Sequence, residues 1–593
     1  MFSLWDTFRA AHPLYTLIEK KRTADFINTF LKQYEQGGRL PVWELASNET
    51  DCMIGYHSVS VMADAMAKGI TGFDYEKAFE AANHSAMLDH LGLDAYKKNG
   101  FISMDDEHES VSKTLEYAYD DWCIAQMAQI LNKTEEYDYF MQRSQSWKNV
   151  FDWKTGFMRP KKNGGWDKPF DPREINNNFT EGNSWQYSFF VPQDIPGMIA
   201  AYGGNDKFEA KLDEMFNSES KTTGREQVDV TGLIGQYAHG NEPSHHMAYL
   251  YNYIGKPEKT TEKAHYILNN FYKNSPDGLI GNEDCGQMSA WYVLSSMGMY
   301  AVTPGHAEWS EVKPLFEKIK INFEDGKSEF ITENSVRSRL GIPITRYNWI
   351  KPKLTESIIP VPVIQAESKS FRDKMTVEIF SKNPKDEVLY GIISKSGSQI
   401  YKKYEKPFTI DNSCTVLAYS KSENEKSNFI SATFFKKPNN YTIDIKSKYN
   451  PQYHAGGNDG LIDGIFGTTN WRKGDWQGYQ SQDFEAIVDL QETKTISEIH
   501  SNYLQDQRSW ILMPTKVEYF TSIDNVNFTL VGSVTNDVNP KQEENSIKDF
   551  SFTSKPINAR YVKVKAYSFG KLPEWHQGFG GDAFIFIDEI TIK

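Results

Sequence analysis

Three segments in the first half of the chain place carboxylates beside amides, aromatic rings and glycines. They are 178–187 (NFTEGNSWQY), 239–246 (HGNEPSHH) and 281–291 (GNEDCGQMSAW). Hydrolysis of a glycosidic bond uses a protonated carboxyl for the leaving oxygen, an ionised one to activate water, and amides and rings to hold the sugar. A single Glu in such a segment is also a common helix cap. Three clusters in one region favour a sugar-hydrolysing site.

Two carboxylates in these segments suit the two roles. Glu181 is followed by Trp185 and Tyr187, and a carboxyl against apolar rings has a raised pKa and keeps its proton near neutrality. We therefore expect Glu181 to be the general acid. Asp284 stands at the start of a predicted helix, where the dipole favours the ionised form, and we expect it to be the base.

The segment at 239–246 is ambiguous on its residues alone. Glu242 and His246 have the i, i+4 spacing that shares a helix face, and a Glu with two histidines, His245 and His246, can bind zinc. The spacing is not HExxH, however, and Pro243 begins a helix after Glu242. A buried pair of core histidines is the other interpretation left open.

Three further motifs accompany these segments in order: 2–14 (FSLWDTFRAAHPL), 55–58 (GYHS) and 119–122 (YDDW). Together the six motifs resemble the catalytic domain of the glycoside hydrolase family 92 α-mannosidases, over roughly residues 1–345. The resemblance implies a calcium-dependent, inverting exo-α-mannosidase acting on terminal α-linked mannose of N-glycans or mannan. It also implies an (α/α)6 toroid paired with an N-terminal β-sandwich, and it places the general acid at Glu181.

The resemblance assigns further residues to the sugar pocket, with the two histidines near the position that tunes linkage preference. Asn282 stands where some relatives carry a second Asp, and Trp5 is either a stacking floor for the sugar or part of the core. Calcium takes oxygen ligands and can chelate vicinal hydroxyls such as O2 and O3 of mannose. The calcium candidates are Asn241, Glu242 and Gln287. The expected substrate-binding residues are Trp5, Asp6, Arg9, His57, Trp185, Glu242, His245, His246 and Asn282.

Residues 14–300 have the periodicity of successive helices separated by Gly, Pro and Asn loops. About eleven segments are expected, which suits antiparallel helix pairs in a toroid. A solenoid has the same periodicity, but no repeated sequence unit supports one. The expected segments are 14–34, 58–67, 74–91, 111–131, 135–151, 182–190, 194–201, 207–216, 243–254, 260–273 and 286–299.

The second half of the chain changes to alternating, strand-like patterns, such as 318–323, 375–380 and 415–419. We expect a multidomain chain: a toroid at 1–345, a small fibronectin-like β-sandwich at 346–438, and a β-sandwich at 439–593. The last segment resembles the discoidin, or factor five/eight type C, domain, often a carbohydrate-binding module. That resemblance implies a structural calcium site at Asp463 and Glu589, although Asp463-Gly464 also suits a plain turn. Candidate sugar contacts, of which one or two are expected in the core, are Trp471, Arg472, Trp476 and Trp510.

Composition narrows the partners and the compartment. The 593 residues carry a net charge of −14 without a basic block, so nucleic acid is not an expected partner. No window is apolar enough for a membrane span, and the four cysteines form no metal spacing. No signal peptide is visible, although the family resemblance implies a periplasmic, surface or secreted protein. We expect mannose-containing glycans as partners and a monomeric chain.

The chain begins inside a family motif, at Phe2. We therefore expect a family member without its N-terminal sandwich, with a separately encoded sandwich as a candidate partner. In families whose pocket is shared between two domains, positioning contributes several kcal/mol, on the order of 7 to 11 at best. The alternative to an active mannosidase is thus a weak or inactive homologue that acts as a carbohydrate-binding protein. An adhesion protein built on the discoidin domain is a third possibility, which the Glu181/Asp284 pair disfavours.

Overall fold

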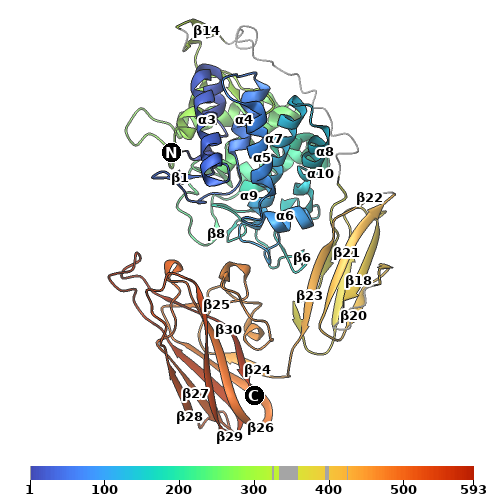
Figure 1. The fold of residues 1–593 in the computed structure, drawn as a ribbon, viewed down its shortest axis with the longest axis vertical. Coiled ribbons are helices and arrows are strands. Elements are labelled where there is room, and N and C mark those ends of the chain that lie inside the picture. The colour runs from blue at the N-terminus through green and yellow to red at the C-terminus, as the bar shows by residue number, and fades with distance from the viewer. Residues whose placement is uncertain (1, 324–325, 333–357, 394–399, 424) are drawn as a thin grey trace. The chain divides into compact units, whose positions relative to one another are not determined.

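The computed structural model describes residues 2–323, 326–332, 358–393, 400–423 and 425–593. These residues form two compact units (Figure 1). Unit 1 comprises 1–161, 166–360 and 425–428, and unit 2 comprises 162–165, 361–424 and 429–593. The boundary expected at 345/346 lies outside the described residues.

Unit 1 is mainly helical, with short two-stranded ribbons in its loops (Figure 1). Leucine, alanine and aromatic residues at helical spacing supply the buried face of each helix. The α-helices are α1 (Leu4–Thr7), α2 (Ala11–Ile18), α3 (Lys20–Gly37), α4 (Ser58–Ala67), α5 (Tyr75–Met87), α6 (Leu93–Asn99), α7 (Ser110–Ile130), α8 (Thr134–Arg143), α9 (Ser184–Tyr187), α10 (Ile195–Tyr202), α11 (Asn205–Asn217), α12 (Pro257–Asn270) and α13 (Gln287–Met297).

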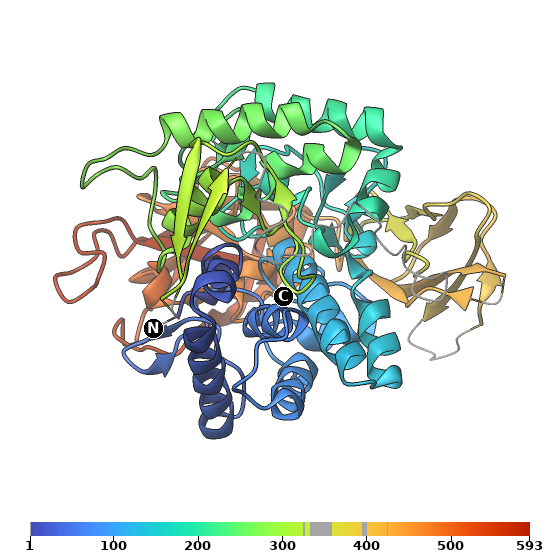
Figure 2. The same cartoon turned by 90° about the horizontal axis from the view of Figure 1, so that it is seen from above.

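The helices of unit 1 follow one another around the unit in chain order, as Figure 2 shows from dark-blue α3 to the green helices. Successive helices pack on each other, and the last one, α13, packs against α2 near the start of the chain. A side chain makes this closure specific. The Oε1 atom of Gln287 on α13 accepts hydrogen bonds from the backbone N–H groups of Ala10 (2.9 Å) and Ala11 (3.1 Å).

Most predicted helices are present, with three instructive differences. The segment 14–34 is two helices, because Glu19 between α2 and α3 has non-helical backbone angles, with φ of −137° and ψ of 56°. The helix α3 ends at the predicted glycine stop, Gly38. The segment 243–254 is two 3-10 helices, Glu242–Ser244 and Met247–Ile254. The short helix α6 was not predicted, because its seven residues are too few to show a clear period.

Unit 2 begins with a small β-sandwich. One sheet has the order β15 (Val363–Gln365), β17 (Met375–Phe380), β20 (Phe408–Ile410). The other includes β23 (Ile430–Lys436), β21 (Cys414–Ser422) and β18 (Glu387–Ile393), with β21 antiparallel to both neighbours. Buried and exposed residues alternate along β17, as the sequence pattern predicts for a strand with one face on a core.

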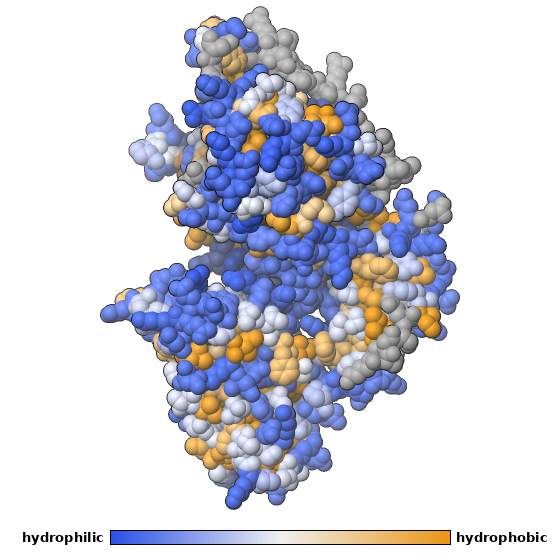
Figure 3. All heavy atoms as spheres, viewed as in Figure 1, coloured by the Kyte–Doolittle hydropathy of each residue, from blue (hydrophilic) through white to orange (hydrophobic). Residues whose placement is uncertain are grey.

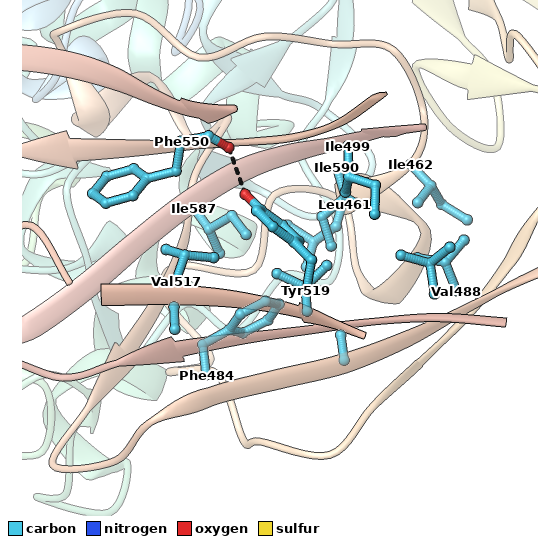
Figure 4. Close-up of a cluster of buried hydrophobic side chains, with 14 of the residues drawn as sticks. Leu461, Ile462, Phe484, Val488, Ile499, Val517, Tyr519, Phe550, Ile587 and Ile590 are labelled. Atoms are coloured by element: carbon cyan, nitrogen blue, oxygen red, sulfur yellow. Dashed lines mark hydrogen bonds between the residues drawn. The ribbon is translucent and has the colours of Figure 1, made fainter. Parts of the chain in front are cut away.

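The remainder of unit 2, from Thr442, is a second β-rich domain. Its sheet has the order β25 (Gln477–Gln480), β30 (Phe584–Ile592), β26 (Phe484–Gln505), β29 (Ser546–Tyr567), β27 (Lys516–Ser522), β28 (Thr529–Thr535), and β24 (Thr442–Ile445) pairs with β26. The register of β26 against β29 shifts twice, and such bulges let long strands bend around a core. Figure 4 shows that core, where the hydroxyl of Tyr519 donates to the carbonyl of Phe550 among aliphatic side chains.

The visible face in Figure 3 is mainly hydrophilic, and hydrophobic residues occur there in separate small patches. Charged residues make up 24% of the chain, which is close to the average for soluble domains. Among the residues that the structure places, no helix combines the length and the apolar character that crossing a bilayer requires.

Candidate active site

Three carboxylates from distant parts of the chain meet in unit 1. Asp6 lies on α1, Glu242 begins a 3-10 helix, and Asp284 precedes α13; one oxygen of each lies within 4.8 Å of the others. In the described part of the chain, neither carboxylate oxygen of buried Glu242 has a hydrogen-bond partner. Asp6 accepts a hydrogen bond from the hydroxyl of Ser3. We call Asp6, Glu242 and Asp284 the acidic cluster.

The acidic cluster is electrostatically unfavourable without a cation or protons. Burial, followed by the charge of Asp284, raises the pKa of Asp6 to about 8. Burial and Asp6 raise the pKa of Glu242 well above its usual range. Buried like charges at this spacing cannot all stay ionised unaided, whereas a hard divalent cation is held by such oxygens. The residues therefore fit calcium, through a set only partly predicted: Glu242 belongs to it, Asp6 joins it, and Asp284 lies beside both.

Of the two other calcium candidates, Gln287 has its side-chain oxygen engaged elsewhere, and Asn241 uses its amide nitrogen as a donor. The oxygen of Gln287 already accepts two backbone hydrogen bonds from the start of α2, and its amide nitrogen lies 3.1 Å from Nδ1 of His245. Asn241 donates its amide to Glu181, at 2.9 Å to the carbonyl oxygen and 3.3 Å to Oε2. Gln287 thus joins the two ends of unit 1, and Asn241 orients the candidate acid.

Glu181 has the environment expected of a general acid. Burial, followed by the charge of Asp229, raises the pKa of Glu181 to about 7, and Asp284 also contributes to the rise. Burial is the cause that the sequence predicts. Trp185, however, packs edge-on against Phe157 in the core and is 3% exposed, so it offers little surface to a sugar. Tyr187 instead fixes the preceding turn by donating to the carbonyl of Thr180 at 2.7 Å.

Asp284 precedes α13 but does not cap it. The carboxylate of Glu283 takes that place, accepting from the backbone N–H of Ser289 at 3.0 Å and from its hydroxyl at 2.7 Å. The prediction that the helix dipole favours ionised Asp284 is therefore corrected: burial and Asp229 raise the pKa of Asp284. Because Glu283 occupies the helix end, Asp284 is free to face the acidic cluster.

Both candidate catalytic carboxylates have left-handed backbone angles, with φ of 45° at Glu181 and 45° at Asp284. Residues other than glycine adopt this conformation at a cost of about 1 to 3 kcal/mol, and such residues gather at functional sites. Two separate loops therefore each hold an acidic residue in a strained backbone conformation. The charges of both residues act on the acidic cluster.

Glycines allow the loops behind these carboxylates to touch. Gly281 has φ of +97°, and a Cβ there would lie 2.5 Å from the backbone oxygen of Gly240. The N–H of Gly240 donates to the carbonyl of Thr231 at 3.0 Å, which adds a third loop. The segments that carry Glu242 and Asp284 are therefore in direct backbone contact.

We expect Gly281→Ala to remove the response to calcium together with any activity, because the new methyl group forces the 240 and 281 loops apart. Gly204→Ala is the matched control: Gly204 has φ of +101°, but among the described residues nothing lies within 4 Å of its Cβ position. Both variants carry the same backbone strain. Thermal unfolding measured with calcium and with chelator distinguishes the two variants. An unchanged calcium response in Gly281→Ala would refute the role of the loop contact.

Arg9 and His57 are buried, at 4% and 1% exposure, and each is held by carboxylates. Arg9 pairs with Glu116 at 3.1 Å, and His57 bridges Glu116 (2.6 Å) and Asp120 (2.7 Å). Burial alone would lower the pKa of His57, but Asp120 and Glu116 outweigh it and raise the pKa to about 9. Both cations are thus fixed by carboxylates: Asp120, which belongs to the 119–122 motif, and Glu116, which lies outside every motif.

Trp5 and the two histidines are also core residues. Trp5 is 1% exposed, which favours the core interpretation over a stacking floor. Nε2 of His245 lies 3.0 Å from the carbonyl of His239, and Nε2 of His246 lies 2.9 Å from that of Phe189. Burial lowers the pKa of His245 to about 3 and that of His246 to about 4, so both are neutral. The geometry gives no support to a zinc site or a direct sugar contact through this pair.

In the C-terminal domain, Asp463 and Glu589, the two residues predicted to bind a structural calcium, are neighbours. One oxygen of Glu589 accepts from the backbone N–H groups of Asp463 (3.2 Å) and Gly464 (3.1 Å). Burial, then the charge of Asp463, raises the pKa of Glu589 to about 9, and burial raises that of Asp463 to about 6. Asp588 is a third buried carboxylate here, not predicted, whose pKa burial raises to about 7.

The predicted sugar-contact tryptophans of this domain divide into two groups. Trp471 and Trp476 belong to a buried cluster, and their indole N–H groups donate to Asp506 (3.0 Å) and to the carbonyl of Thr468 (2.8 Å). They are core residues, and Arg472 covers the ring of Trp471 at 4.3 Å. Trp510 is 37% exposed and remains a surface candidate.

The catalytic-domain model of glycosyl hydrolase family 92 matches residues 1–349, more than half of the chain. The chain therefore belongs to this family of glycoside hydrolases. The F5/8 type C domain model matches residues 444–580, so the β-rich C-terminal domain is of the discoidin type.

Solved structures of the same family are similar to this chain. A family GH92 α-mannosidase of Bacteroides thetaiotaomicron is 44% identical, with a TM-score of 0.53, and covers 56% of this chain and 44% of that one. A structure of that α-mannosidase in complex with mannoimidazole is 37% identical to this chain, with a TM-score of 0.54. It covers 69% of this chain and 49% of its own. A family GH92 inverting mannosidase of the same organism has 37% identity, a TM-score of 0.50 and coverages of 56% and 47%.

A curated relative is the uncharacterized secreted glycosidase of Arthroderma benhamiae, 28% identical over 355 residues, which are 53% of this chain and 43% of that protein. The chain spans less than half the length of this relative and of the matched mannosidase structures.

Proposed function

We propose that this chain is a calcium-dependent, inverting exo-α-mannosidase that removes terminal α-linked mannose from N-glycan or mannan-type glycans. The observation that carries the proposal is the acidic cluster of Asp6, Glu242 and Asp284. Glu181 accompanies it, with a pKa that burial, Asp229 and Asp284 raise to about 7. Mannosidases among the similar structures support the substrate class. The secreted glycosidase relative supports a location outside the cytoplasm.

The helical unit suits an (α/α)6 toroid. Helices follow one another around unit 1, and α13 packs against α2, so that the ring closes on itself. Such closure brings loops from the start and from the last third of the unit to one place. Asp6 comes from the start, and Glu242 and Asp284 come from the last third. We propose domains at 1–345, 346–438 and 439–593, with the C-terminal one as a carbohydrate-binding module.

In the proposed mechanism, Glu181 donates its proton to the leaving glycosidic oxygen. Asn241 orients its carboxyl group, and burial keeps it protonated near neutral pH. Asp284 removes a proton from the water that attacks the anomeric carbon from the opposite face, which gives inversion. Calcium, when bound, supplies a positive charge that holds sugar hydroxyls and keeps neighbouring carboxylates ionised. Asp6 and Glu242 would hold it.

The test of the proposal is release of mannose from α-linked manno-disaccharides and yeast mannan, with calcium and with chelator. Turnover that needs calcium and falls in Glu181→Gln supports the proposal. Binding of mannan without turnover by the wild-type chain would favour the alternative, a carbohydrate-binding homologue.

Calcium should stabilise unit 1 through Glu242. A ligand at 100 times its Kd stabilises a folded protein by about 2.7 kcal/mol, a rise of several degrees in unfolding temperature. We expect calcium to raise the unfolding temperature of the wild type, and Glu242→Gln to lose the larger part of that rise. Glu589→Gln, at the C-terminal carboxylates, controls for a second calcium site. Zinc replacing calcium in this assay and in turnover would contradict the proposed metal.

An aromatic surface of the C-terminal domain is the proposed glycan contact of the module. Trp510, Trp575 and Phe579 are 37%, 38% and 64% exposed. The loop that carries the last two packs on Trp510, since a Cβ at Gly578 would lie 2.6 Å from that ring. Aromatic rings give sugar-binding surfaces apolar area without charge.

We expect Trp575→Ala to weaken binding of mannan about tenfold, the equivalent of about 1.4 kcal/mol, without changing turnover of a manno-disaccharide. Ile523→Ala is the control, because Ile523 is 53% exposed on the β27–β28 hairpin of the same domain. Affinity electrophoresis in mannan gels measures both. Equal retardation of Trp575→Ala and wild type would place the glycan contact elsewhere.

A further inference from the structure

Asp229 is an acidic residue outside every motif, on a loop shortly before β9 (Leu233–Ile234). Its two oxygens each hold a side-chain amide. Oδ1 accepts from Nδ2 of Asn282 at 3.1 Å, and Oδ2 accepts from Nε2 of Gln227 at 2.6 Å. Because Asp229 accepts a hydrogen bond from each amide, it fixes the side chains of Asn282 and Gln227.

The bond to Asp229 determines how Asn282 presents its amide. An ionised carboxylate only accepts hydrogen bonds, so the –NH2 group of Asn282 must face Asp229. The carbonyl oxygen of Asn282 then faces away from Asp229 and remains an acceptor. Asn282 is exposed and stands two residues before Asp284. An exposed acceptor beside the candidate base is placed to bind a water or a sugar hydroxyl.

The loop of Asp229 is anchored to the catalytic loops by backbone contacts. Thr231 accepts from the N–H of Gly240 at 3.0 Å, and Gly232 accepts from the N–H of His239 at 3.1 Å. The 240 segment leads into Asn241, which orients Glu181. Asp229 is also, after burial, the foremost influence on the pKa of both Glu181 and Asp284. Its charge therefore acts on both candidate catalytic carboxylates.

We propose that Asp229 is a positioning residue for glycoside hydrolysis, which holds the Asn282 amide with its carbonyl oxygen presented to the attacking water or to a substrate hydroxyl. The inference rests on the proposed function and adds a residue to it. Asp229 itself touches neither substrate nor water in this role. Its effect passes through the orientation of Asn282.

Exchanging the residues at 229 and 282 tests this role. The measurement is the kinetics of hydrolysis of an α-linked manno-disaccharide in the presence of calcium. In Asp229→Asn the amide of Asn282 can turn over, and we expect kcat to fall about tenfold to a hundredfold, as misplacement does in such sites, with KM changed less than about threefold. Asn282→Asp sets two carboxylates against each other and should lose as much. The double variant restores a carboxylate–amide bond with an oxygen acceptor at 282, and should regain at least about tenfold over either single variant.

The control is Asp213→Asn, because Asp213 also bridges two donors, Tyr251 (2.8 Å) and Lys259 (2.6 Å), on separate elements of unit 1. We expect it to leave kcat unchanged at a similar loss of unfolding temperature. Three results would overturn this inference while leaving the proposed function standing. They are a wild-type kcat in Asp229→Asn, an equal loss of kcat in the Asp213→Asn control, and a double variant that is no faster than the single variants. The wild type is assayed beside Glu181→Gln. If the wild type shows no turnover in that assay, the proposed function and this inference are both overturned.

Discussion

Glu181→Gln should reduce hydrolysis of an α-linked manno-disaccharide by about a hundredfold to ten-thousandfold, the range that general acid catalysis contributes. The amide has nearly the same shape and keeps an oxygen that can accept the hydrogen bond from Asn241, so the loop should remain folded. What is lost is the proton for the leaving oxygen. An activated aryl mannoside, whose leaving group needs little protonation, should lose far less.

The pH profile gives the same assignment a second readout. Because the pKa of Glu181 is raised to about 7, the acid is protonated below that value, and wild-type activity should fall as pH rises through it. Glu181→Gln should lack this alkaline limb. Equal losses on both substrates, or an unchanged alkaline limb, would remove Glu181 from the acid role. Unfolding temperatures of variant and wild type serve as the control for folding.

Asp284→Asn should remove activity on every substrate, the aryl mannoside included, because activation of water is needed whatever the leaving group. The raised pKa of Asp284 predicts an acidic limb: activity falls as pH drops and the carboxylate takes up a proton. Kinetics of both substrates measure the loss, which we expect to reach about a hundredfold or more.

The matched control for Asp284→Asn is Glu283→Gln, one residue earlier, whose carboxylate caps α13. It should lower stability, by about 1 kcal/mol for a lost cap, while retaining most activity. A residual rate near wild type in Asp284→Asn, or equal losses in the two variants, would show that the base is another residue.

The sequence was informative where a motif combines chemistry with a fixed local structure. Glu181 and Asp284 each follow from residues close in sequence, and most helices follow from their periodicity. Glu242 was placed near a metal for its oxygens, and the structure sets it in a cluster of three carboxylates. Asp6 was expected only to line the pocket, because its place in that cluster depends on ring closure between α13 and α2.

Other residues could not be placed from the sequence, for reasons of burial. Arg9 and His57 are polar residues in site-like motifs, yet buried carboxylates pair with them far along the chain. Residue types alone do not distinguish a side chain that lines a pocket from a buried side chain next to it. Asp229 carried no signal, because its role depends on a loop contact with Asn282. Trp471 and Trp476 show the same limit, since exposed and buried tryptophans look alike in sequence.

The central claim is that Glu181 and Asp284 act on opposite faces of an α-mannoside. The most direct measurement is the anomeric form of the mannose first released from an α-linked manno-disaccharide by this chain in calcium, followed by proton NMR before mutarotation. We expect β-mannose to appear first and α-mannose to accumulate only later. Release of α-mannose first, or release that persists unchanged in Glu181→Gln, would contradict the claim.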